Sequence, residues 1–195
     1  MVFYWFNCCM KFVDLKKYGF ATEPRYYFYG WTSEPRVLAR ESVAKRLVRA
    51  RKFLPKGYNF KIWDCLRPRP VQIKMIGNFR RRLTAAHPTK SKAEIERLVW
   101  NFCAKPAKTV VRPDTHRNGG ALDLTIVDVR GRELYMGTDF DDATERAGTD
   151  FFEKKKELDI LEKEARKNRR IFCRAMKRAG FENYHNEWWH WSFDK

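Results

Sequence analysis

The chain has 195 residues, of which 44% are hydrophobic and 15% aromatic. This length suits a single domain with a sizeable core, and the aromatic content excludes an intrinsically disordered chain. A membrane span is excluded too, because the longest apolar stretch, residues 1–6, is far shorter than the ~20 residues that a transmembrane helix needs. The net charge of +17 raises the expectation of an anionic partner, but a basic surface on a soluble protein is the simpler explanation.

The cysteine content indicates a reducing compartment. There are five cysteines and no C-x-x-C pair, which argues against a disulfide framework and against a Cys-rich zinc site. Residues 1–10 look somewhat like the apolar core of a signal peptide, but they lack a basic start and an A-x-A cleavage site. We therefore expect a cytoplasmic protein in which residues 1–10 form an N-terminal extension and residues 11–195 form one domain.

Hydrophobic periodicity predicts both helices and strands. Apolar residues recur at helical spacing in residues 36–54, whereas residues 58–63 alternate as a strand does. Ser91 and Glu94 have the spacing of a capping box at the start of a helix. The predicted elements, in chain order, are extended segments and turns at 11–31, helices at 36–54 and 71–83, a helix starting after Ser91, a strand at 121–129, a helix at 151–179 that ends at Gly180, and an aromatic strand at 188–193. This order predicts an α+β fold, with a small mixed or antiparallel sheet and helices packed beside it.

Two of the four histidines stand near carboxylates. His116 is followed by two glycines and then by Asp123 at the start of a predicted strand, and Glu187 precedes His190 by three residues among bulky aromatic rings. Two imidazoles and one carboxylate, with a further carboxylate to move protons, are the groups of a catalytic zinc site with an open position for water. Structural histidines and core aromatics are the more common explanation of each motif taken alone.

Five segments, in the same order, resemble motifs of the zinc D-alanyl-D-alanine dipeptidases. The loop D-T-H-R-N-G-G-A-L-D at residues 114–123 resembles S-x-H-x-x-G-x-A-x-D, and E-W-W-H at 187–190 resembles E-x-W-H. The remaining matches are W-D-C-L-R-P at 63–68, M-G-T-D-F-D at 136–141 and F-V-D-L at 12–15. The resemblance covers nearly the whole chain, from about residue 11 to 191, and implies a catalytic domain of this type over residues 11–195.

The resemblance also implies a role for each matching residue. His116, Asp123 and His190 would bind one zinc ion per chain. Glu187 would act first as general base and then as general acid, activating water and protonating the leaving amine. Arg67 would stabilise the oxyanion of the tetrahedral intermediate.

Substrate contacts follow from the same comparison. Asp141 would hold the free ammonium of a dipeptide, with Asp64 as a second candidate for this contact. Asp114 stands where the family has serine and would repel a substrate carboxylate if it faced the site. Trp188 and Trp189 would form walls of the pocket, although core packing explains them nearly as well.

Three hypotheses follow. The first is hydrolysis of D-alanyl-D-alanine or a closely related dipeptide, and the second is a D,D-carboxypeptidase or endopeptidase that acts on longer peptidoglycan peptides. The third is a basic module that binds an anionic polymer. A small dipeptide is the expected partner, with no specific nucleic acid and no membrane span. The physiological role, whether antibiotic resistance, cell-wall recycling or nutrient use, stays open.

Overall fold

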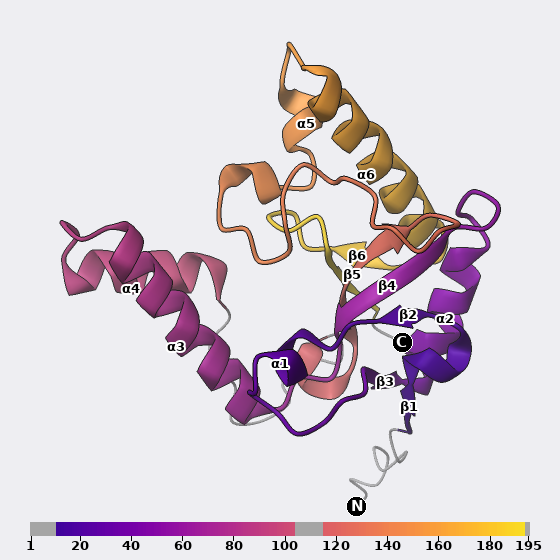
Figure 1. Ribbon diagram of the computed structural model, residues 1–195, viewed down its shortest axis with the longest axis horizontal. Helices are drawn as coiled ribbons and strands as arrows, with labels where there is room; N and C mark the ends of the chain where they lie inside the picture. Colours follow the sequence, from indigo (N-terminus) through magenta and orange to yellow (C-terminus); the bar gives the residue numbers. More distant parts are fainter. Residues whose placement is uncertain (1–10, 104–114, 194–195) are drawn as a thin grey trace, which may run out of the picture.

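The computed structural model describes residues 11–103 and 115–193 (Figure 1). Within these ranges the chain forms one α+β arrangement with a five-stranded mixed sheet, a two-stranded sheet and helices beside them. The strands are β1 (Phe12–Asp14), β2 (Ala21–Thr22), β3 (Leu38–Arg40), β4 (Asn59–Asp64), β5 (Ala121–Val127), β6 (Glu182–Asn183) and β7 (His190–Ser192). The α-helices are α1 (Arg25–Phe28), α2 (Glu41–Arg51), α3 (Arg69–Ala86), α4 (Lys92–Phe102), α5 (Phe151–Lys154) and α6 (Ile160–Arg178). The 3-10 helices are η1 (Leu15–Tyr18), η2 (His116–Asn118) and η3 (Glu145–Ala147).

The larger sheet has the strand order β2-β4-β5-β7-β6, in which only the β2–β4 pair is parallel. Its register pairs Asp64 of β4 with Asp123 of β5, and Asp123 with His190 of β7. A bulge at Trp63 shifts the β4 register just before Asp64. Because paired residues share one face of a sheet, the pairing brings three polar side chains together at one end of the central strands.

The main core lies around β5, whose seven residues are all buried. This strand therefore lies inside the fold with both faces covered. Among the largest fully buried side chains are Trp191, Phe60 and Phe172, which join β7, β4 and α6. Burying an aromatic side chain of this size stabilises the fold by roughly 1.5–3 kcal/mol relative to leaving it exposed. The polar side chains at the paired ends of β4, β5 and β7 are thus supported by a well-packed core.

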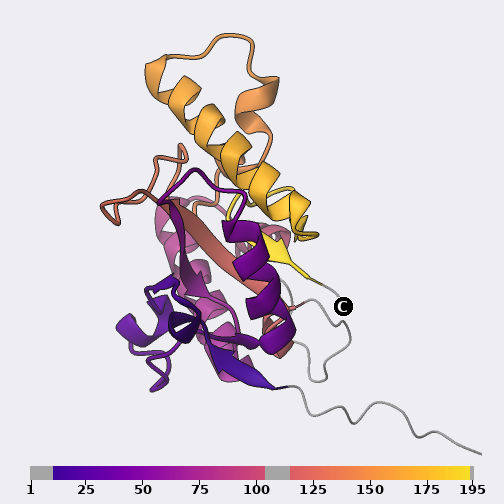
Figure 2. The same ribbon diagram turned by 90° about the vertical axis from the view of Figure 1, so that its right-hand side faces the viewer.

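Helices α3 and α4 form a hairpin that projects from this body, on the side away from α2 (Figures 1 and 2). The hairpin has its own apolar cluster of Ile76, Ile95, Val99 and Cys103, apart from the main core. The capping box predicted at Ser91 is present and starts α4. The body and the hairpin are therefore two packed units of one chain.

The α+β prediction is confirmed, but two local predictions are wrong. The single helix expected at 151–179 is two helices, because Asp159 and Glu162 form a capping box that starts α6 afresh. The helix expected at 36–54 is shorter, since Leu38–Arg40 pair with β1 as a strand. Gly180 does follow the last helix, with a φ of +85°.

No helix within the described ranges has the length and apolar character needed to cross a membrane.

Candidate metal centre

Three candidate ligands come from adjacent parts of the sheet. Asp123 lies on β5, His190 begins β7, and His116 lies on η2 just before β5. Gly119 ends η2 with a φ of +70°, and a Cβ at this position would lie only 3.1 Å from the backbone nitrogen of Arg40. Glycine alone meets both conditions without strain. The tight turn expected at the two glycines therefore exists, and it folds His116 back over the start of β5.

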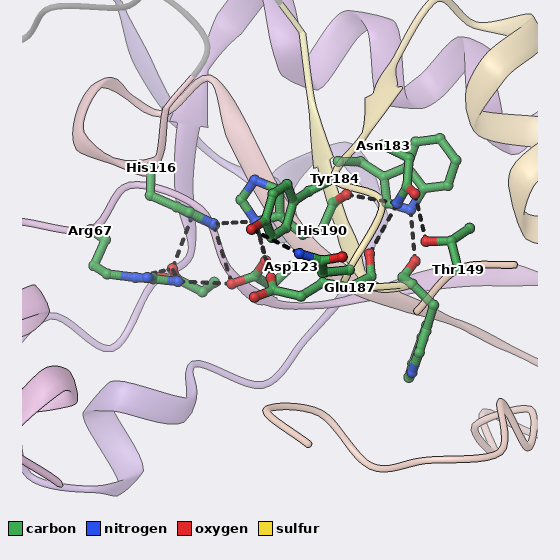
Figure 3. A network of polar contacts seen from close by, with 12 residues as sticks. Arg67, His116, Asp123, Thr149, Asn183, Tyr184, Glu187 and His190 are labelled. Carbon is green, nitrogen blue, oxygen red and sulfur yellow. Dashed lines mark hydrogen bonds and ion pairs between the residues drawn. The ribbon is translucent and has the colours of Figure 1, made fainter. Parts of the chain in front are cut away.

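One nitrogen of each imidazole and the carboxylate of Asp123 lie close together, in an arrangement that we call the ligand triangle (Figure 3). His190 Nδ1 lies 3.0 Å from Asp123 Oδ1 and 3.1 Å from His116 Nε2. His116 Nε2 in turn lies 3.3 Å from Asp123 Oδ2. A tetrahedral zinc ion with bonds of 2.0–2.1 Å separates its ligand atoms by about 3.3 Å. In both donor type and spacing, the three residues fit a zinc ion.

Two oxygen atoms that contact Nδ1 fix the orientation of the His116 ring. Its Nδ1 lies 2.9 Å from the carbonyl oxygen of Cys65 and 3.1 Å from Oδ2 of Asp64. Both oxygens are acceptors, so Nδ1 carries a hydrogen and Nε2 faces the triangle, where it can bind a metal once its own proton has left. Burial and Arg67 oppose a further proton, but the charges of Asp123 and Asp64 outweigh them and raise the pKa of His116 to about 9. The carboxylates thus make this position favourable for a cation.

Asp123 and His190 have the protonation states that metal binding requires, whereas His116 has to release a proton on binding a metal. Burial acts to raise the pKa of Asp123, but its contacts with His116 and His190 hold that pKa well below its usual range. Burial lowers the pKa of His190, which favours the neutral ring. An ionised carboxylate and a neutral imidazole are the forms that coordinate metals.

Arg67 lies buried beside the triangle, between two carboxylates. Its Nε donates to Asp64 Oδ2 over 2.7 Å and its Nη2 donates to Asp123 Oδ2 over 2.8 Å (Figure 3). Nη1 donates to Gln72 Oε1 on α3 over 2.9 Å. Burial alone would lower the pKa of Arg67, but the neighbouring acids, Asp64 foremost, raise it well above its usual value. The guanidinium of Arg67 therefore holds a positive charge in direct contact with Asp123, one of the candidate metal ligands.

Glu187 lies on the turn before β7, with its Oε2 3.8 Å from His190 Nδ1. Its side chain is 19% exposed and lines a cavity above the triangle. Burial, followed by the negative charges of Asp123 and Asp141, raises the pKa of Glu187 to about 8. A carboxyl group with such a pKa gains and loses protons near neutral pH, which is what general acid–base chemistry needs.

Asp141 faces the same cavity from a strained backbone. It is the non-glycine residue with a positive φ, +62°, in the described part of the chain. Burial, together with the charge of Asp123, raises the pKa of Asp141 to about 7. Strained backbone conformations cluster at functional sites, where the surrounding structure holds them in place.

The cavity has a volume of about 960 Å³. Its floor is the ligand triangle with Arg67 and Glu187, and Phe140 and Trp189 form part of its wall. Across from the floor stand residues of the α3–α4 hairpin. The cavity therefore lies between the two packed units of the chain.

Two of the predicted substrate contacts are not among the described residues that line the cavity, and a third lies outside the described residues. Asp64 is not among the described residues that line the cavity; it contacts Arg67 and His116 from behind. Trp188 packs in the core, with its Nε1 donating to Thr138 Oγ1 over 2.8 Å, and is not among the described residues that line the cavity. Asp114 lies outside the described residues.

The wall of the cavity that α3 forms was not predicted from the sequence. Residues of α3 that line it follow one another by three or four positions, so they lie on one face of the helix: Arg69, Gln72, Met75, Asn78, Phe79 and Arg82. A polar stripe at helical spacing was visible in the sequence, but only the hairpin geometry shows that it faces the site.

Comparison with known proteins agrees with the geometry of the ligand triangle. Residues 28–195 match the model of peptidase family M15, described as D-ala-D-ala dipeptidase. The chain belongs to this family. As a member it is a metallopeptidase, and the resemblance seen in the sequence is confirmed.

Three relatives are similar over half of this chain or more. A D-alanyl-D-alanine dipeptidase of Enterococcus faecalis is 29% identical over 92% of this chain and 89% of its own length. One from Synechocystis is 27% identical over 78% of this chain and 68% of its own length. One from Escherichia coli is 29% identical over 50% of this chain and 48% of its own length.

Proposed function

We propose that this metallopeptidase hydrolyses D-alanyl-D-alanine or a closely related dipeptide, with one zinc ion held by His116, Asp123 and His190. The observation that carries the proposal is the close approach of His116 Nε2, His190 Nδ1 and the two Asp123 carboxylate oxygens, with contacts of 3.0–3.3 Å, beside Glu187. Family membership favours this hydrolase over a module that only binds an anionic polymer.

A zinc ion in this position supplies a Lewis acid that polarises the peptide carbonyl and acidifies the attacking water. Glu187 takes a proton from the attacking water while the oxygen of that water forms a bond to the carbonyl carbon. Arg67 places its positive charge beside the carbonyl oxygen as negative charge builds there. Glu187 then passes the proton to the nitrogen of the breaking C–N bond, so that two free amino acids leave. The raised pKa of Glu187 supports both proton transfers.

Asp141 is proposed to bind the free ammonium of the substrate. It lines the same cavity as Glu187, and none of the described residues forms a hydrogen bond or ion pair with its carboxylate. A carboxylate with an open acceptor suits a cation, because a charge-assisted hydrogen bond is stronger than a neutral one. A substrate without this amine would lose the contact.

A longer peptide is the second candidate substrate, and the size of the cavity favours it. Cavities that hold drug-sized ligands have volumes of roughly 300–1,000 Å³, and this one, at about 960 Å³, exceeds what two alanine residues fill. N-acetyl-D-Ala-D-Ala separates the candidates. A dipeptidase that requires the ammonium loses activity on this substrate, whereas a carboxypeptidase retains it.

The direct test is release of D-alanine from D-Ala-D-Ala by the metal-free protein, the zinc-loaded protein and the zinc-loaded protein with a chelator. Activity should appear with zinc and disappear with the chelator. One zinc per chain without D-alanine release would overturn the proposed substrate but not the metal site. Failure to bind zinc would overturn the metal site as well. The cytoplasmic compartment and the physiological role stay predictions from the sequence.

A further inference from the structure

The α3 face that lines the cavity opposite the ligand triangle carries four polar residues besides Met75 and Phe79. Of the six cavity-facing residues of α3, two are arginines, Arg69 and Arg82, one near each end of the helix. Gln72 and Asn78 lie between them on the same face. Gln72 accepts a hydrogen bond from Arg67 Nη1 of the same chain, whereas Arg82, toward the other end of the helix, is exposed and can contact a polar ligand in the cavity.

Arg80 and Arg82, which stand on either side of Arg81 in α3, have different surroundings. Arg80 points to α4, where its Nη2 donates to Glu96 Oε2 over 3.0 Å. Arg82 lines the cavity and has no hydrogen bond or ion pair with any described residue. Its charge acts on Asp141, the acid proposed to bind the substrate ammonium. Arg82 and Asp141 thus line the same cavity, in which the amino-terminal end of the substrate is proposed to lie.

We propose that Arg82 determines specificity by binding a carboxylate carried by the amino-terminal residue of the substrate. This inference rests on the proposed function and deepens it: the preferred substrate class is a D,D-dipeptide, or a longer peptide, with an acidic side chain next to its free amine. The cavity has room for that side chain, which D-alanyl-D-alanine lacks. The planar guanidinium matches a carboxylate in a two-point contact.

The test compares D-Glu-D-Ala with D-Gln-D-Ala, which have nearly the same shape and differ in charge. For the zinc-loaded native enzyme we expect kcat/KM to be about fivefold or more higher for the acidic peptide, with the ratio falling as salt is added. Arg82→Gln should bring the ratio to about one. Arg81→Gln is the matched control, because Arg81 is exposed on the same helix, carries the same charge and is not among the residues that line the cavity.

A ratio near one in the native enzyme, or a preference that persists in Arg82→Gln, overturns the proposal. An equal loss of preference in Arg81→Gln also overturns it, because the effect would then come from net charge alone. If no D-peptide is hydrolysed, the proposed function fails, and calorimetric affinities of the same two peptides for native protein and both variants test Arg82 separately. Tighter binding of D-Glu-D-Ala that is lost only in Arg82→Gln supports the inference.

Discussion

The backbone N–H of Arg67 donates to the carbonyl oxygen of His116 over 2.8 Å. This bond joins the loop after β4 to the turn before β5, so the proposed oxyanion contact and the first proposed zinc ligand share one backbone link. Asp64 adds a second link, because its Oδ2 accepts from Arg67 Nε and lies 3.1 Å from His116 Nδ1. The two functional side chains are therefore positioned together, and a change at one is expected to affect the other.

Removing Asp64 tests this positioning. Asp64→Ala should lower zinc affinity by roughly 10–100-fold, the usual cost of losing a group that orients a metal ligand. It should also lower kcat, since Arg67 loses one of its two carboxylate partners. Zinc affinity is measured by competition with a chelator of known affinity. Asp142→Ala is the control, because that acid lines the cavity but is not one of the partners of His116 or Arg67. Unchanged zinc affinity in Asp64→Ala would mean that the Cys65 carbonyl alone orients the ring.

Glu187→Ala separates proton transfer from metal binding. General acid–base groups contribute roughly 10²–10⁴-fold to rate, so kcat should fall by about that factor. The zinc content, measured by elemental analysis, should stay at one per chain, because the triangle is intact without Glu187. Glu164→Ala, an exposed change on α6, should leave both values as they are. Near-normal turnover of Glu187→Ala would falsify the proton-shuttle role.

Gly137→Ala should destabilise the protein more than Gly131→Ala. Both glycines have a positive φ, +90° and +77°, so both variants carry the same kind of backbone strain. A Cβ at Gly137 would also collide with the ring of Phe152, whereas nothing lies within 4 Å of a Cβ at Gly131. The collision is expected to add ~1–3 kcal/mol to the loss of unfolding free energy. Urea unfolding of both variants measures the difference, and equal losses would mean that the Phe152 ring moves aside at little cost.

The charge of Glu162 should stabilise the fold at neutral pH and cease to do so in acid. Its hydrogen bonds from Lys155, then from Arg146 and the Asp159 backbone, lower the pKa of Glu162 to about 2. Because the folded pKa lies below the unfolded value of about 4.3, this stabilisation is complete above the unfolded pKa and is lost as the pH falls toward 2.

Unfolding free energies of native protein and Glu162→Gln from pH 7 down to pH 2 measure this effect. The difference should be constant at pH 6–7 and shrink steadily below about pH 4. The exposed neighbour Glu164 gives the control, Glu164→Gln, which should show no such pH dependence. A difference that stays the same at pH 2.5 would show that the loss in Glu162→Gln comes from geometry and not from charge.

Local signals in the sequence identified much of this molecule. Ser91 with Glu94 marked the start of α4, the two glycines marked the turn after His116, and alternation marked β4 within a residue or two. Each of these depends on neighbours in the chain. The break before α6 was missed, because Asp159 in a run of charged residues looks the same inside a helix as at its start.

The approach of the candidate ligands could not be predicted from periodicity. His116 and His190 are 74 residues apart, and their contact depends on the antiparallel pairing of β5 with β7. Only the resemblance to a known family joined them in the sequence. The role of α3 could not be predicted either, because whether a polar helix face meets solvent or a cavity depends on where the hairpin packs.

The separate apolar cluster of the α3–α4 hairpin has a consequence for motion. A unit with a small core of its own opens at lower free energy than the β5 region, so its amide hydrogens should exchange with deuterium faster than those of the central strands. A ligand that bridges the ligand triangle and Arg82 holds the two units together. Its binding should therefore slow exchange along α3.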